Sequence, residues 1–137
     1  MLSLVEDKLL LEADNVKEKL YYLKMKADYL RYKVEIAKGD ERSSFAEKAG
    51  DAYFEATEAA QYLADTDLIK LGVALNYSVF NYEILNDSNK ACELAKEAFD
   101  NAINALDQVP DEGYKDSTLI MQLLRDNMAL WECGNGL

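Results

Sequence analysis

Charged side chains recur at helical spacing between residues 17 and 35, where they could form a binding site. Successive members are separated by 7, 4, 3 and 4 residues, which places them on one face of a helix: Lys17, Lys24, Asp28, Arg31 and Glu35. Tyr32 lies beside this face. Composition alone favours the other interpretation, a solvated face with ion pairs between successive turns.

Two asparagines inside apolar helical patterns are the next candidates for function. Asn76 shares a face with Gly72, Val79 and Glu83, and Asn127 is surrounded at helical spacing by Ile120, Leu123, Leu130 and Trp131. An amide offers one donor group and one acceptor, the pair needed to hold the backbone of an extended peptide. The alternative is a core asparagine whose amide forms its hydrogen bonds within the protein, beside an ordinary core tryptophan.

The residue types exclude most enzyme chemistry. The chain has no histidine, which removes the commonest general base, the usual nucleophile pairs and the usual zinc ligands. Gly134 and Gly136 have no helix after them and do not form a phosphate loop. Neighbouring carboxylates such as Asp65 and Asp67 lie at helix starts, where they are caps far more often than metal ligands. We therefore predict no catalytic residue, no metal site and no cofactor.

Charge and cysteine content indicate the partners and the compartment. The 137 residues carry a net charge of −11, so nucleic acid and anionic membranes are poor partners. No signal peptide and no membrane span are predicted. Cys92 and Cys133 lack CxxC spacing, which predicts free thiols in a reducing compartment. These features predict a cytoplasmic protein.

Apolar periodicity and the scarcity of proline and glycine predict an all-α fold. Six helices are expected, the first of them partial, within the ranges 2–12, 15–37, 40–63, 66–86, 88–106 and a last one that starts between 111 and 117 and ends by 131. Asn15 is the expected cap of the second helix, and Leu20, Leu23, Ala27, Leu30 and Val34 its core stripe. Short connections predict antiparallel helix hairpins in a single domain, residues 1–137, with a flexible tail at 132–137.

Three segments resemble one known family in the right order. Residues 22–32 (YLKMKADYLRY) resemble the segment YLKMKGDYYRY of the 14-3-3 family, and residues 72–85 (GVALNYSVFNYEIL) resemble its GLALNFSVFYYEIL. Residues 114–131 (YKDSTLIMQLLRDNMALW) are similar to the family signature. The resemblance implies a non-enzymatic adaptor that binds phosphoserine or phosphothreonine peptides in a concave groove.

The resemblance also implies a role for each matching position. Arg31 and Tyr32 correspond to the phosphate contacts, and Asn76 and Asn127 to the amides that hold the peptide backbone. The remaining peptide contacts correspond to Lys24, Glu83 and an apolar wall made of Val79, Leu123, Leu130 and Trp131. Targets of the type Arg-x-x-phosphoSer-x-Pro suit an acidic protein, because their basic flanks are attracted to it.

The match to the family begins at Leu2, partway through the fourth of the family's nine helices. The dimerisation helices and two phosphate-binding cations of the third helix have no counterpart here, so we expect weakened binding of phosphorylated clients. The other hypothesis is a structural helical half-domain without phosphate binding. Such a half-domain would self-associate through the apolar side chains of Leu2, Val5 and Leu9 and of the Leu20 to Val34 stripe.

Overall fold

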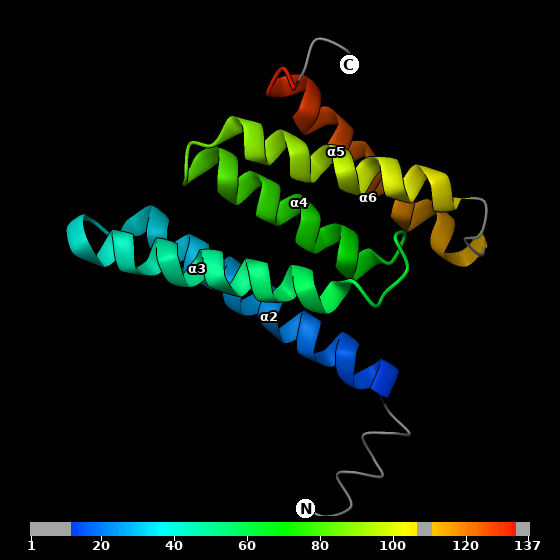
Figure 1. The fold of residues 1–137 in the computed structure, drawn as a ribbon, viewed down its shortest axis with the longest axis horizontal. Helices are drawn as coiled ribbons and strands as arrows, with labels where there is room; N and C mark the ends of the chain where they lie inside the picture. Colours follow the sequence, from blue (N-terminus) through cyan, green and yellow to red (C-terminus); the bar gives the residue numbers. More distant parts are fainter. Residues whose placement is uncertain (1–11, 107–110, 134–137) are drawn as a thin grey trace, which may run out of the picture.

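The computed structural model describes residues 12–106 and 111–133, and within these residues every regular element is a helix. The helices are α2 (Glu12–Ile36), α3 (Gly39–Ala60), α4 (Leu68–Glu83), α5 (Ser88–Ala105) and α6 (Asp111–Leu130). Consecutive helices run antiparallel (Figure 1). The prediction of an all-α array of helix hairpins is therefore confirmed, whereas residues 2–11 of the helix expected at 2–12 lie outside the described residues.

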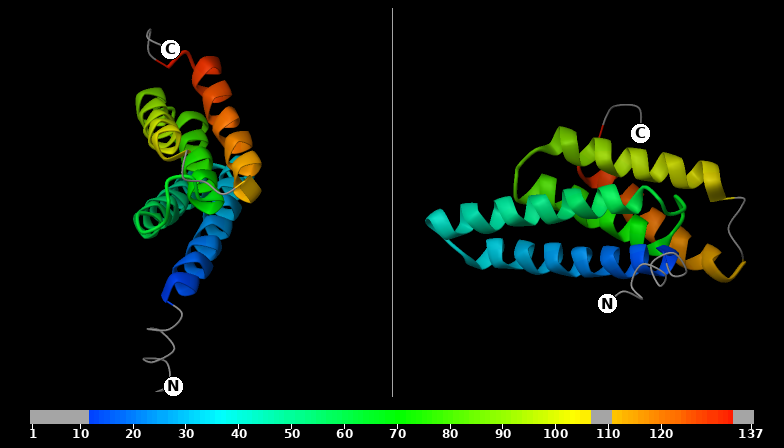
Figure 2. Two further views of the ribbon diagram at one scale, coloured as in Figure 1. Left: turned by 90° about the vertical axis from the view of Figure 1, so that its right-hand side faces the viewer. Right: turned by 60° about the horizontal axis from the view of Figure 1, so that its bottom comes forward.

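The helix α4 lies in the middle of the molecule. Figure 2 shows α3 and α5 on one side of it, and α2 and α6 on the other. Two apolar clusters join α4 to α2 and α3 through Val73 and Phe80, and a third joins it to α5 and α6 through Leu71. Because α4 is shared by all three clusters, it fixes α2 and α6 relative to each other.

Small residues on α3 let α2 and α4 approach closely. Ala49, Ala52, Ala56 and Ala60 are all buried, and the large side chain among them, Tyr53, is fully buried as well. A Cβ at Gly50 would lie 3.5 Å from the Phe80 ring, an ordinary van der Waals distance, so α3 and α4 pack closely here although an alanine would also fit.

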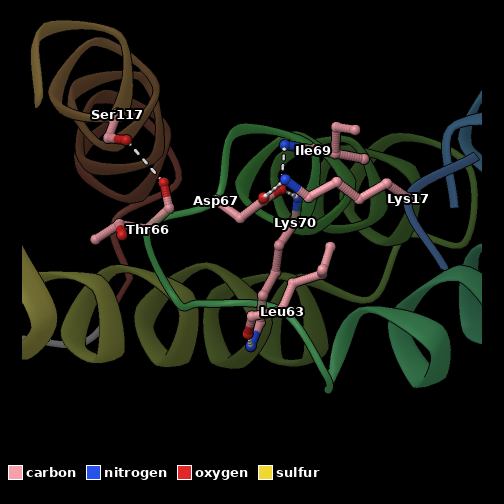
Figure 3. Close-up of polar contacts among 7 residues, drawn as sticks. All are labelled: Lys17, Leu63, Thr66, Asp67, Ile69, Lys70 and Ser117. Carbon is pink, nitrogen blue, oxygen red and sulfur yellow. Dashed lines mark hydrogen bonds and ion pairs between the residues drawn. The ribbon is translucent and has the colours of Figure 1, made fainter. Parts of the chain in front are cut away.

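The loop between α3 and α4 ties three helices together (Figure 3). Asp67 caps α4 by accepting from the backbone N–H groups of Ile69 and Lys70, at 2.9 and 3.2 Å, and it also pairs with Lys17 of α2 at 3.6 Å. Ser117 of α6 donates its hydroxyl to the Thr66 carbonyl at 2.7 Å. The ends of α2, α4 and α6 that meet at this loop are thereby held in fixed positions.

Two details of α2 differ from the prediction. Asn15 does not start the helix, because α2 is already helical from Glu12 and no glycine or proline interrupts it there. The Leu20 to Val34 stripe is at most 8% exposed, since it packs on α3 and α4. This stripe is core, as its periodicity predicted, and is not a free surface for self-association.

Candidate phosphopeptide-binding face

All ten predicted site residues lie on α2, α4 and α6 or directly after α6, and none lies on α3 or α5. They are Lys24, Arg31 and Tyr32 on α2, Asn76, Val79 and Glu83 on α4, and Leu123, Asn127, Leu130 and Trp131 on or just beyond α6. The helices that carry them lie next to one another, with α4 in contact with both α2 and α6. We call the surface formed by these residues the site face.

The carboxylate of Asp28 brings two of the predicted residues together. It accepts from Lys24 Nζ at 3.0 Å and from Asn76 Nδ2 at 3.0 and 3.1 Å. The Tyr53 hydroxyl of α3 donates to the same carboxylate. One half-buried carboxylate thus joins α2, α3 and α4 at the edge of the site face.

Sequence reasoning treated Asp28 as one charge of a solvated face and did not single out Tyr53. Tyr53 is fully buried, and burial, followed by its hydrogen bond to Asp28, raises the pKa of its hydroxyl above the ordinary value. The sequence does contain a signal for this contact, since Tyr53 lies inside the alanine stripe of α3. A tyrosine at such a buried position requires a hydrogen-bond partner for its hydroxyl. The partner, Asp28, lies 25 residues away in the chain and comes within reach of the hydroxyl through the packing of α2 on α3.

Gly72 of α4 makes room for the Lys24 side chain. A Cβ at Gly72 would lie 3.1 Å from Lys24 Cε, which is tighter than most real contacts. The lysine stem therefore crosses α4 over this glycine on its way to Asp28. The glycine that shares a face with Asn76 in the sequence pattern is thus part of the same arrangement.

Arg31 and Tyr32 lie just beyond Asp28 on α2. The side chain of Arg31 is half-buried, and its Nε atom is buried without a hydrogen-bond partner among the described residues. The ring of Tyr32 is 58% exposed. The guanidinium of Arg31 forms no ion pair with another described residue, so its terminal nitrogens can bind an anion, and the neighbouring Tyr32 hydroxyl can reach solvent or a ligand.

The part of the site face on α6 is apolar and open. Leu123 and Leu130 are exposed, 46% and 75%, and Asn127 is half-buried between them, with a side-chain amide that forms no hydrogen bond to the described residues. Trp131 stacks on Tyr82 of α4 with ring centroids 4.7 Å apart. Val79 is half-buried and Glu83 exposed on α4. The structure therefore joins Trp131 to α4 through Tyr82, a partner that sequence reasoning did not assign.

A disulfide between Cys92 and Cys133 holds the segment after α6. The prediction of two free thiols is wrong, because the hairpin of α5 and α6 brings these residues to a Cα distance of 5.4 Å although they are 41 positions apart. The inference of a reducing compartment loses the support that rested on free thiols. Cys133 is also buried, and residues 134–137 of the predicted tail lie outside the described part.

Within the described residues, no group of three or more His, Cys, Asp or Glu side chains is placed to hold a metal ion. None of the described helices is long and apolar enough to cross a bilayer.

Comparison with known proteins decides the family. The family model described as "14-3-3 protein" matches residues 1–132. The chain belongs to the 14-3-3 family. It is similar to 14-3-3 protein homolog 1 of Schistosoma mansoni, with 57% identity over 131 residues, which is 96% of this chain and 52% of that protein. It is also 52% identical over 136 residues to 14-3-3 protein beta/alpha of Rattus norvegicus, which is 98% of this chain and 55% of that protein.

A further relative, the 14-3-3 protein homolog of Encephalitozoon cuniculi, is 59% identical over 117 residues, 85% of this chain and 45% of that protein. The chain thus spans about half the length of the 14-3-3 relatives that it matches. The resemblance noted in the sequence is confirmed at the level of the family.

Proposed function

We propose that the chain is a non-enzymatic adaptor module that binds phosphoserine or phosphothreonine peptides on the site face. Membership of the 14-3-3 family supports this function, as does the placement of all ten candidate residues on α2, α4 and α6 or directly after α6. The observation that carries the proposal is the guanidinium of Arg31, which is half-buried and forms no ion pair with another described residue. A phosphate that pairs with this cation would accept charge-assisted hydrogen bonds, which are roughly twice as strong as neutral ones.

The other candidate residues fit an extended peptide on either side of the phosphate. Asn76 and Asn127 would hold its backbone, and the apolar wall of Leu123, Leu130 and Trp131 would accept its side chains. Because these contacts do not involve the phosphate, they should contribute equally to phosphorylated and plain peptides.

The charges available on this chain make strong binding by the chain alone unexpected. A phosphoserine carries about −1.5 to −2 charges at pH 7. Arg31 faces it with one positive charge, and Lys24 is already paired with Asp28 at 3.0 Å. The resemblance implies two further phosphate-binding cations in the family's third helix. Without the hydrogen bonds from these two cations, binding would be weaker by about 100-fold to 10,000-fold.

Charge reversal at Arg31 tests the proposal. Calorimetry with one peptide in phosphorylated and plain forms, at fixed salt, should show that Arg31→Glu removes the preference for the phosphorylated form. Arg42→Glu is the matched control, because it changes the net charge equally at an exposed position of α3, a helix that carries none of the candidate site residues. An unchanged preference in Arg31→Glu would show that the phosphate binds elsewhere.

A second function, self-association without phosphate binding, is favoured by one exposed surface. Apolar and aromatic side chains between 55% and 62% exposed follow one another along α2: Tyr21, Tyr22, Met25, Tyr29, Tyr32 and Ile36. We call this surface the tyrosine stripe. It replaces the Leu20 to Val34 stripe as the candidate for association, and it contains Tyr32, so association would cover a proposed phosphate contact.

Sedimentation separates the two functions. If the tyrosine stripe mediates association, the wild type should be oligomeric at tens of micromolar, and Met25→Lys with Ile36→Lys should make it monomeric. Phe54→Lys on α3, which is 58% exposed, is the control for an added charge on an exposed apolar residue. A monomeric wild type would rule out this second function.

A further inference from the structure

The side-chain carboxylate of Asp28 accepts hydrogen bonds from three residues. Its oxygens accept from Lys24 of α2, Tyr53 of α3 and Asn76 of α4. Asn76 is 48 residues away in the chain and Tyr53 is 25 residues away. The carboxylate therefore fixes the position of side chains from two other helices.

The chemistry of these partners determines how the Asn76 amide is turned. A carboxylate can only accept hydrogen bonds, so the amide nitrogen must face Asp28. The two contacts from Nδ2, at 3.0 and 3.1 Å, are consistent with this orientation. The carbonyl oxygen Oδ1 is consequently directed away from the carboxylate, and it accepts no hydrogen bond from the described residues.

We propose that Asp28 is a positioning residue that fixes the Asn76 amide so that Oδ1 presents an acceptor to a backbone N–H of the bound peptide. This inference rests on the proposed function and adds to it a selection for the peptide residue that faces Asn76. The peptide residue that faces Asn76 must carry a backbone N–H, so proline or an N-methylated residue is rejected at that one position. A freely rotating amide could present either its donor or its acceptor and would not discriminate in this way.

Positioning and simple charge repulsion make opposite predictions for Asp28. A negative charge near a phosphate opposes binding, and Asp28 also neutralises Lys24. If charge alone mattered, Asp28→Ala would strengthen binding of the phosphorylated peptide and leave a neutral plain peptide unaffected. If Asp28 positions Asn76, the same substitution weakens binding of the plain peptide.

The variants are made in a Tyr53→Phe background, because Asp28→Ala alone would leave the buried Tyr53 hydroxyl without its acceptor. Tyr53→Phe alone is the control: it removes one donor from Asp28 and leaves the Asn76 contacts, so plain-peptide affinity should change less than 2-fold. Adding Asp28→Ala should weaken the plain peptide by about 3-fold to 10-fold, as loss of one neutral hydrogen bond does. Asn76→Ala should have the same effect, and adding Asp28→Ala to Asn76→Ala should cause no further loss.

Peptides in which each backbone N–H in turn is replaced by an ester oxygen provide the specific readout. Wild type and Tyr53→Phe should lose affinity strongly at one peptide position, and this sensitivity should disappear when Asp28 or Asn76 is replaced by alanine. A purely structural role of Asp28 would lower affinity evenly and keep the position-dependent loss, which would overturn the inference.

The outcomes distinguish this inference from the proposed function. If the wild type shows no preference for the phosphorylated peptide, the proposed function fails and the inference fails with it. If the preference is present but Asp28→Ala leaves plain-peptide affinity and the ester profile unchanged, only the inference is wrong. The NMR signals of the Asn76 side-chain amide give a ligand-free check, because Asp28→Ala should shift them and speed their exchange with solvent, and unchanged signals would contradict the positioning role.

Discussion

Tyr53 is a buried phenol at the centre of the contacts that shape the site face. Its ring stacks on Tyr77 with centroids 5.5 Å apart and lies 5.4 Å from Phe80, and its hydroxyl donates to Asp28. The pKa of Tyr53 is raised by burial and by that hydrogen bond, and the pKa of Tyr77 is raised by burial. Both tyrosines therefore keep their protons in the folded protein under conditions where the unfolded chain loses them.

This difference predicts that the stability of the protein falls in alkaline solution. Above pH 10.0, the ordinary pKa of tyrosine, the unfolded chain releases protons that the folded protein retains. The free energy of unfolding should therefore be insensitive to these groups below about pH 10. Above it, the free energy should decrease by up to about 1.4 kcal/mol per pH unit for each tyrosine that stays protonated. Urea unfolding between pH 8 and pH 11.5 measures this slope.

Tyr53→Phe serves as the control for the alkaline slope. The variant should be less stable near pH 7 by about 1.5 to 3 kcal/mol, because it loses a hydrogen bond to a charged group. Its alkaline slope should be shallower than that of the wild type, with the remaining slope due in part to Tyr77. Equal slopes in the two proteins would mean that the Tyr53 hydroxyl is not held in its protonated form.

At the scale of elements, the end of α6 is fixed by three separate interactions. The Cys133 N–H donates to the Met128 carbonyl at 2.9 Å, and Glu132 has a φ of 55°, which together form a Schellman-type helix end. Trp131 stacks on Tyr82, and the disulfide joins Cys133 to Cys92 near the start of α5. The residues of α6 on the site face are therefore positioned by contacts to both α4 and α5.

Reduction of the disulfide should destabilise this end of the protein. For residues 41 positions apart, the chain-entropy model gives about 4 kcal/mol. A thiol reductant should therefore lower Tm by on the order of 10 °C. Trp131 fluorescence should change with it, because the tryptophan is two residues from Cys133. Calorimetry with and without dithiothreitol measures the shift.

The double variant Cys92→Ala and Cys133→Ala provides the matched control for reduction. Its Tm should be close to that of the reduced wild type and should not respond to dithiothreitol. A wild-type Tm that is the same with and without the reductant would contradict the stabilising role of the disulfide.

Over the whole molecule, local sequence signals predicted most of the fold. The alanine stripe of α3 and the apolar spacing of α4 are repeated over several turns, and the α4 cap at Asp67 is a short-range side-chain contact with its own backbone. The start of α2 was predicted wrongly at Asn15, because a favourable cap residue does not begin a new helix when the residues before it are already helical, here from Glu12. Signals within single helices were thus sufficient for the elements, though not for every boundary.

The features that the sequence did not predict depend on residues far apart in the chain. The Cys92–Cys133 bond requires the packing of α5 against α6, and the Asp28 cluster requires α2, α3 and α4 to meet. The assignment of Arg31 and Asn127 to phosphate and peptide came from family resemblance and not from periodicity, since charge spacing on one helix equally fits a solvated face. Their roles remain predictions.

The central claim, that the site face binds phosphopeptides, is tested most directly by NMR of the ¹⁵N-labelled chain during titration with a phosphorylated peptide and its plain form. The largest shifts should fall on α2, α4 and α6, at the amides of Arg31, Asn76 and Asn127 and at the Trp131 indole. Shifts that differ between the two peptides should centre on Arg31 and Tyr32. Shifts concentrated on α3 and α5, or identical shifts with both peptides, would contradict the claim.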